Sequence, residues 1–204
     1  MPQTRSKKTP AARRAGSERK RTGAQFAGSL IPESERGAAP RFVSSAHLVS
    51  ERSPELSEFE FGMILAVNAF NRWVVRCMAA AGVKEMTTLE VLLLHHVHHR
   101  ARKKKLADIC FMYNIEDTHV VSYSLKKLVA MGLVESTKSG KEVLFSTTAR
   151  GGDVIARYRE VREHCLISGL SRDGNENPEL GELAHFLRHL SALYDQAARA
   201  ATSL

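Results

Sequence analysis

The feature that most constrains the fold is an abrupt change of hydrophobic period at Gly132. Over residues 116–131 the apolar side chains recur at steps of three and four, which is the spacing of one helical face. Residues 133–146 instead alternate between apolar and polar side chains around Ser139-Gly140, a pattern typical of a β-hairpin. The chain must therefore place a helix directly before a two-stranded ribbon.

A second, shorter helix is predicted upstream of this change. Residues 104–113 carry apolar side chains at helical spacing, Asn114 interrupts them, and Glu116-Asp117 are acids suited to a new helix start. The order is then short helix, turn, helix, glycine, strand, basic turn and strand. This order predicts a winged helix-turn-helix, in which the second helix enters the major groove of DNA and the hairpin contacts the backbone.

The rest of the chain is predicted to be helical. Residues 58–81 form a long first helix ended by Gly82, and a second helix begins at Thr87 or Thr88 and ends near Arg100. Thr87 and Glu90 have the spacing of a capping box. Three apolar sets define the buried faces: Phe59, Met63, Val67, Phe70, Val74 and Cys77 in the first helix; Val121, Leu125 and Leu128 in the fourth; Val154, Tyr158, Val161 and Cys165 in a fifth, which Thr148 caps.

The last helix, from Pro178 to about Thr202, has the apolar spacing of a coiled-coil seam. Its apolar and small residues alternate steps of three and four, namely Leu180, Leu183, Leu187, Leu190, Tyr194, Ala197 and Ala201. The pattern favours a homodimer built on this helix, and burial against the first helix is the alternative. The expected fold class is thus mainly α with a small β-hairpin, a winged helix-turn-helix on a helical dimerisation frame.

The positive charge is concentrated at the beginning of the chain. The net charge is +8, yet residues 1–21 hold eight Lys or Arg and one acid, which leaves 22 basic and 21 acidic residues elsewhere. We therefore expect a disordered basic arm over 1–40, either a DNA-grasping arm or a solubilising tail. The expected divisions that follow are an N-terminal dimerisation segment (41–86), the winged helix-turn-helix (87–150) and C-terminal dimerisation helices (151–204).

The composition indicates where in the cell the protein is expected to be found. No run of about 18 apolar residues exists and the first twenty residues lack the apolar stretch of a secretory signal, so a cytoplasmic location is expected. The three cysteines are widely spread and lack C-x-x-C spacing. We expect reduced thiols rather than a disulfide framework or a zinc knuckle.

The residues expected to contact DNA come from the fourth helix and the hairpin. Near the helix start, hydroxyl and imidazole groups can bond to base edges, whereas lysines suit phosphates. The candidates are Thr118, His119, Ser122, Tyr123, Lys126, Lys127, Lys138, Lys141 and Lys104. The alternative interpretation of the candidates on the helix is an ordinary polar face exposed to solvent. The alternative for Lys103-Lys104-Lys105 is a run of charges that is simply solvated.

Two segments resemble the MarR family of bacterial regulators: Leu128-Val129-Ala130-Met131-Gly132-Leu133-Val134-Glu135 and Thr148-Ala149-Arg150-Gly151. The resemblance implies an obligate homodimer, binding to a palindromic operator, and release from DNA by a small ligand or an oxidant. The chain departs from the family in two respects. Its wing is shorter and lacks the Asp-x-Arg motif that reads the minor groove, and it carries an arm before residue 58.

Several residues are candidates for sensing. An effector pocket is predicted to be lined by Phe70, Trp73, Arg76 and Cys77. Core packing is the competing interpretation for the two aromatic residues and for Cys77. Cys77 is also a candidate for redox sensing. The run His95-His96-Val97-His98-His99 allows a metal pair on one helix face, although partly buried or dimer-facing histidines are the default. No metal or other cofactor is therefore predicted.

The predicted function is a DNA-binding transcription regulator that responds to a ligand or stress. No nucleophile-base pair, paired carboxylates in a cleft or phosphate-binding glycine loop is found, so the protein is not expected to be an enzyme. Double-stranded DNA and a second copy of the chain are the expected partners, without a membrane. The alternatives are an RNA- or ribosome-associated winged-helix protein, which would lack an aromatic stacking platform here, and a protein-interaction module.

Overall fold

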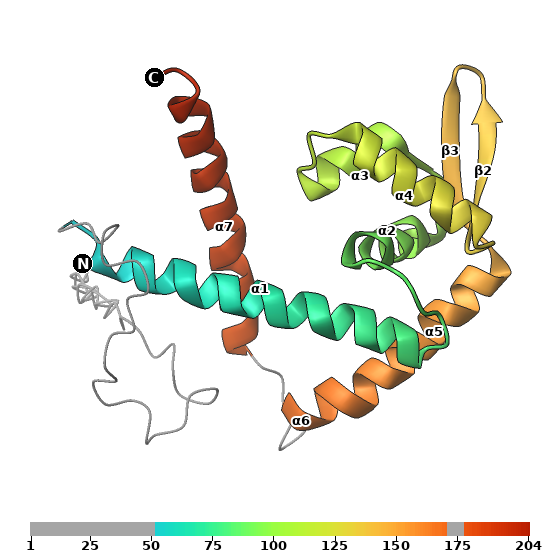
Figure 1. The fold of residues 1–204 in the computed structure, drawn as a ribbon, viewed down its shortest axis with the longest axis horizontal. Helices are drawn as coiled ribbons and strands as arrows, with labels where there is room; N and C mark the ends of the chain where they lie inside the picture. Colours follow the sequence, from blue (N-terminus) through green and yellow to red (C-terminus); the bar gives the residue numbers. More distant parts are fainter. Residues whose placement is uncertain (1–51, 171–177) are drawn as a thin grey trace, which may run out of the picture. The chain divides into compact units, whose positions relative to one another are not determined.

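A computed structural model describes residues 52–170 and 178–204 (Figure 1). The helices are α1 (Pro54–Ala80), α2 (Thr88–His98), α3 (Leu106–Tyr113), α4 (Thr118–Ala130), α5 (Ala149–Arg162), α6 (Ser168–Leu170) and α7 (Pro178–Ala201). The strands are β1 (Lys104–Lys105), β2 (Val134–Ser139) and β3 (Glu142–Thr147). The mainly helical fold with a small hairpin is confirmed. The predictions on residues 1–51, and on the loop over 171–177, lie outside the described residues.

The core lies between the C-terminal half of α1 and helices α2, α4 and α5. It is formed by side chains at the spacing of single helical faces, among them Val74, Met78, Val91, Leu94, Val97, Val121, Leu125, Leu128 and Val154. Ile109 of α3 and Leu133 beside the hairpin close it, and both are fully buried. The predicted inner face of α4 is confirmed.

Local chemistry fixes where the helices begin and end. The capping box is present, since the Thr87 hydroxyl accepts from the Glu90 N–H and the Glu90 carboxylate accepts from the Thr87 N–H. Asp117 and Thr148 cap α4 and α5. Gly132 follows α4 with a φ of +68°, a conformation in which a side chain would be strained.

The hairpin belongs to a three-stranded antiparallel sheet of order β1-β3-β2. Lys104 pairs with Phe145 and Lys105 with Leu144. The prediction that the third helix begins at Lys104 is therefore wrong: two residues are used as an edge strand, and the helix begins at Leu106. Pairing with a partner forty residues away is invisible to a local pattern.

The end of the fifth helix also differs from its prediction. Residues Glu163–Ile167 form a π-helical turn between α5 and α6. Such a turn has a wider hydrogen-bond spacing and moves later side chains out of phase with the preceding helix. Val154 and Tyr158 are buried as predicted, whereas Cys165 is exposed.

The predicted continuous face of α1 divides into two halves. Val74 and Cys77 lie in the core, while Val67 and Phe70 are about half exposed. The N-terminal half meets α7 instead, because the Phe59 and Phe186 rings make an edge contact at 5.8 Å and Tyr194 donates to Glu60. None of the helices in the described ranges is long and apolar enough to cross a membrane.

Candidate nucleic-acid interface

Helix α4 presents one side to the core and the other to solvent. Val121, Leu125 and Leu128 anchor it, and Ser124 is buried beside them. The opposite side carries five of the predicted contacts, of which Thr118, His119, Tyr123 and Lys126 are exposed and Ser122 is half-buried. Tyr123 is 72% exposed, so both its ring and its hydroxyl group are accessible to a partner.

Lys127 is not free to bind phosphate in the way that the sequence predicted. Its amino group forms an ion pair with the Glu90 carboxylate at 2.9 Å and donates to the Glu85 carbonyl oxygen at 2.9 Å. The Glu90 side chain is only 4% exposed. Lys127 therefore holds α4 against the start of α2, and Lys126 is the exposed cation of this pair of lysines.

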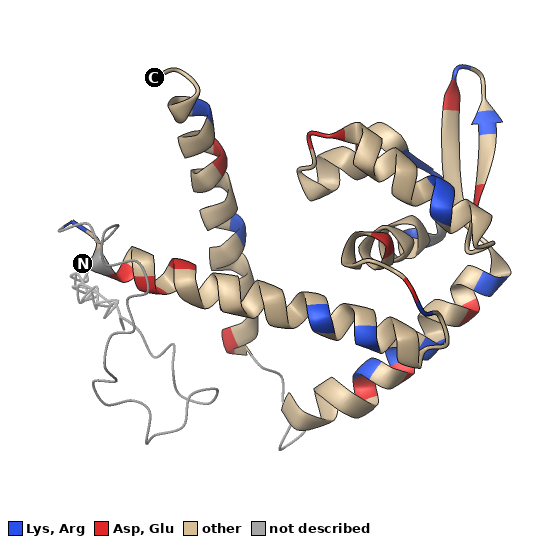
Figure 2. Cartoon of the chain, viewed as in Figure 1, with Lys and Arg blue, Asp and Glu red and all other residues tan. Residues whose placement is uncertain are grey.

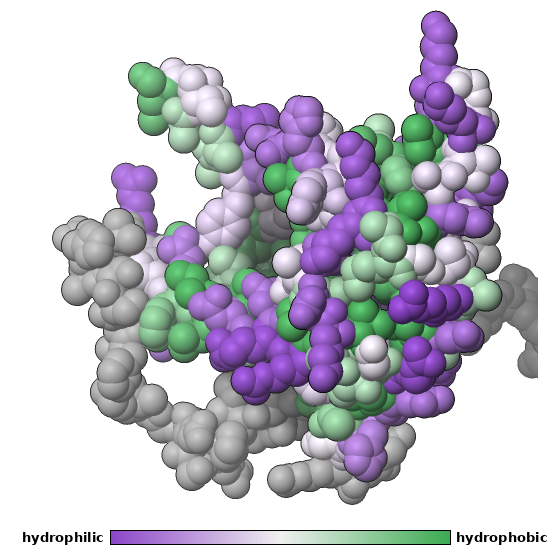
Figure 3. Space-filling view, turned by 45° about the vertical axis from the view of Figure 1, so that its right-hand side comes forward, coloured by the Kyte–Doolittle hydropathy of each residue, from purple (hydrophilic) through white to green (hydrophobic). Residues whose placement is uncertain are grey.

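The wing carries the second group of basic residues. Lys138 and Lys141 are exposed at its tip, next to the turn at Gly140 (Figure 2). Hydrophilic side chains project from this tip in the space-filling view (Figure 3). Lys104, by contrast, is only 9% exposed in β1, which pairs with the central strand, so its side chain is not available for the predicted phosphate contact. Lys103 is exposed and donates to Thr137 of the wing at 3.4 Å.

The base of the wing is fixed to the first turn of α5. The Thr148 hydroxyl donates to the Gly132 carbonyl oxygen at 2.8 Å and accepts from the Gly151 N–H at 3.0 Å. Arg150 donates to the Met131 carbonyl oxygen at 2.7 Å. These bonds connect the end of α4 with the start of α5 and so set the position of the wing relative to α4.

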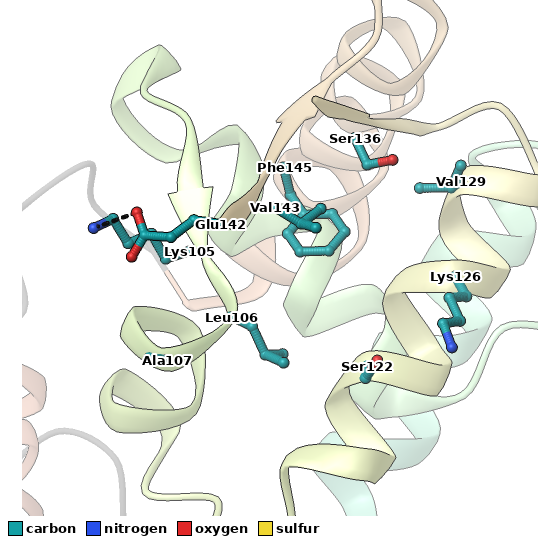
Figure 4. Close-up of a pocket in the computed structure, with 10 residues that line it drawn as sticks. All are labelled: Lys105, Leu106, Ala107, Ser122, Lys126, Val129, Ser136, Glu142, Val143 and Phe145. Atoms are coloured by element: carbon teal, nitrogen blue, oxygen red, sulfur yellow. Dashed lines mark ion pairs between the residues drawn. The ribbon is translucent and has the colours of Figure 1, made fainter. Parts of the chain in front are cut away.

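A cavity of about 490 Å³ lies between α4 and the sheet (Figure 4). Phe145 lies between the strands and α4, and most of the lining is apolar. Ser122 and Lys126 reach it from α4. At its other side, the Lys105–Glu142 ion pair of 2.8 Å raises the pKa of Lys105. The sequence analysis missed this cavity because its walls come from five elements, β1, α3, α4, β2 and β3, that only the tertiary fold brings together.

The predicted effector residues do not converge on one pocket. Cys77 is buried and donates to the Tyr158 carbonyl oxygen, and burial raises the pKa of its thiol. Trp73 packs against the core, whereas Phe70 lines a separate apolar groove with Leu183 and Leu187 of α7. Core packing, the alternative interpretation, accounts for Trp73 and Cys77.

The histidine run is divided among different neighbours. His95 contacts the Tyr158 ring at 4.5 Å and His96 the Tyr113 ring at 5.4 Å, while His98 and His99 are exposed. Burial lowers the pKa of both His95 and His96. Within residues 52–170 and 178–204, no three His, Cys, Asp or Glu side chains are grouped to hold a metal ion.

The domain that contains this interface matches a known family. Residues 86–151 match the model of the winged helix DNA-binding domain, which spans α2 to the first turn of α5. Three solved structures share the fold over most of the described chain, and their similarity to it extends beyond the matched domain. The protein thus contains a winged-helix domain.

The first of these structures is a mutant MarR from E. coli in complex with operator DNA, which is 15% identical with a TM-score of 0.55 and covers 69% of this chain and 99% of that one. AbfR of Staphylococcus epidermidis is 14% identical with a TM-score of 0.58, covering 72% and 96%. The regulator BldR from Sulfolobus solfataricus is 16% identical with a TM-score of 0.54, covering 70% and 98%. No curated protein matches the sequence. At these identities the likeness establishes the fold, which is that of the MarR-like winged-helix proteins.

Proposed function

We propose that the protein is a transcription regulator that binds a palindromic operator as a homodimer. The observation that carries this proposal is the joint presentation of an exposed polar face on α4 and of Lys138 and Lys141 at the wing tip, on a matched winged helix DNA-binding domain. Helix α4 enters the major groove and the wing contacts the flanking phosphates. The MarR structure in complex with operator DNA supports this arrangement.

An RNA-binding role is less well supported by the same surface. The exposed side chains of β2 are polar, and the aromatic residue of β3, Phe145, is 9% exposed. The described strands thus offer no pair of aromatic rings on which unpaired bases can stack. Stronger binding to single-stranded RNA than to any duplex DNA selected from the source genome would favour this alternative.

Two neighbouring substitutions on α4 test the DNA interface. Lys126→Ala should weaken binding to operator and random DNA alike and reduce the slope of log Kd against log salt by about one, because one phosphate contact is lost. Tyr123→Ala should instead change the preference among sequences. The measurement is selection of bound fragments from random duplex DNA, followed by titration of the selected site at several salt concentrations. Equal losses on selected and random DNA for Tyr123→Ala would contradict the assignment of α4 as the recognition helix.

The dimer proposal is supported by apolar side chains that the single chain leaves uncovered on α1 and α7. Ile64, Leu65, Phe70, Phe186 and Leu193 are each at least half exposed. An apolar groove of about 480 Å³ lies between the two helices. Exposed apolar side chains beside an apolar groove are typical of a protein interface, and a second copy placing its own α1 and α7 there is the simplest occupant.

Leu187→Asp should shift the protein from dimer to monomer. Leu187 lines the groove, and a carboxylate there would be desolvated in the interface. We expect the dimer dissociation constant to rise at least about tenfold, measured by light scattering or analytical ultracentrifugation. Ala192→Asp is the matched control, since Ala192 is exposed on the opposite side of the same helix. Equal dissociation in both variants would point to helix destabilisation rather than an interface.

A small ligand that regulates DNA binding would fit the cavity between α4 and the sheet. Its apolar lining suits an aromatic body and the Lys126 amino group suits one anionic group. Because Lys126 also belongs to the DNA interface, bound ligand and DNA compete. Millimolar benzoate should therefore weaken operator binding severalfold. Ala107→Phe, which fills the cavity wall, should bind operator normally and lose the benzoate effect; retention of the effect would place the ligand elsewhere.

A further inference from the structure

A pair of histidines on α7 takes no part in the proposed DNA interface or the apolar groove. His185 and His189 are four residues apart and both are exposed. Their ring centroids are 4.5 Å apart, with the planes tilted by 39°. The two imidazoles thus lie side by side on one face of the helix, one turn apart.

This spacing suits two ligands of one metal ion. Imidazole nitrogens bind Zn²⁺ at about 2.0–2.1 Å, so two rings bound to one ion at an angle of 90–110° have centroids roughly 4.5–5 Å apart. The observed separation lies at the short end of that range. Both side chains are exposed, so rotation about their side-chain torsions can turn a nitrogen of each ring toward a common ion.

The pair lies away from the groove between α1 and α7. Leu183 and Leu187 line the groove with α1, and the helical repeat of 3.6 residues puts His185 and His189 on the far side of the helix from them. Metal binding at this pair therefore does not require the groove to be empty, and Leu193, one turn beyond His189, is the side chain of the dimer proposal that lies nearest to it.

We propose that His185 and His189 form a bidentate site for one divalent transition-metal ion, with water in the remaining coordination positions. Nitrogen ligands select Cu²⁺, Ni²⁺ and Zn²⁺ over Mg²⁺ and Ca²⁺, which require oxygen. The affinity should follow the order Cu²⁺ > Ni²⁺, with Mg²⁺ not binding. The pair on α7 is a better chelator than the run on α2, in which His95 and His96 make separate ring contacts.

Calorimetric titration of the full chain with Ni²⁺ tests the site. We expect one ion per chain at this pair and at least a tenfold weaker affinity in His185→Ala and in His189→Ala. His164→Ala is the matched control because His164 is also exposed on a helix and has no histidine one turn away. It should bind like the unmodified protein.

A residue-specific measurement separates this pair from the other histidines. On addition of Zn²⁺, the ring NMR signals of His185 and His189 should shift together, before those of His98 and His99. Circular dichroism of the two alanine variants should be unchanged, since both side chains are exposed. Unaltered Ni²⁺ affinity in either alanine variant, or Zn²⁺ shifts confined to the α2 histidines, would overturn the proposal.

Discussion

Gly151→Ala is expected to lower the free energy of unfolding by about 3 kcal/mol or more, because the added methyl group has no space. A Cβ at this position would overlap the Leu133 carbonyl oxygen and lie 2.7 Å from Cγ2 of Thr147. The first of these neighbours is backbone, held by the Thr148 N–H, so it cannot turn aside as a side chain would. Urea denaturation followed by circular dichroism measures the loss.

Gly152→Ala is the matched control in the same helical turn. A Cβ there meets only Cε1 of His98, at 3.8 Å, which is ordinary contact. Alanine in place of glycine in a helix stabilises by up to about 1 kcal/mol, so this variant should be as stable as the parent or slightly more stable. Similar losses in both variants would show that helix α5 does not pack as closely against the wing as the structure has it.

Glu90→Ala should have the second largest effect, a loss of about 2–3 kcal/mol. The carboxylate accepts from the Thr87 N–H at 2.8 Å and from Lys127 at 2.9 Å, so its removal opens the cap of α2 and the bridge to α4 together. Glu90→Gln keeps an acceptor for the Thr87 N–H and should lose less. Urea denaturation again gives the measurement.

Lys126→Ala is the comparison that separates stability from DNA binding. Its amino group has no role in the core, so this variant should unfold at the urea concentration of the parent while binding DNA more weakly. Lys127→Ala should instead lose stability, because it leaves the Glu90 carboxylate covered and without its cation. Equal stability of the two lysine variants would contradict the structural role of Lys127.

Elements with strong local signals were predictable from the sequence. Capping residues such as Thr87, Asp117 and Thr148 act within three residues, and the hairpin turn at Gly140 lies between two alternating segments. A two-residue strand has no period of its own, so β1 was predicted as part of a helix. The π-helical turn that exposes Cys165 likewise leaves no signature in the spacing of apolar residues.

The candidate site was predictable in its location and less so in its members. The exposed face of α4 followed from the positions of Val121, Leu125 and Leu128. The different roles of Lys126 and Lys127 could not be predicted, because the partner of Lys127, Glu90, lies 37 residues away on α2. The same holds for the effector candidates on α1. Their helical spacing groups them on one face, but packing against α2, α5 and α7 places them in different surroundings.

The bonds from Thr148 and Arg150 to the end of α4 have a mechanical consequence. They clamp the base of the wing to the first turn of α5, with Gly151 as the point of closest approach. We therefore expect helix α5 and the wing to move together as one rigid unit. In the proposed dimer, a rotation of the C-terminal end of α5 would then move the wing tips. A change in the helices of the dimer interface would in this way alter the distance between the two wings without any direct contact with the DNA-binding surface.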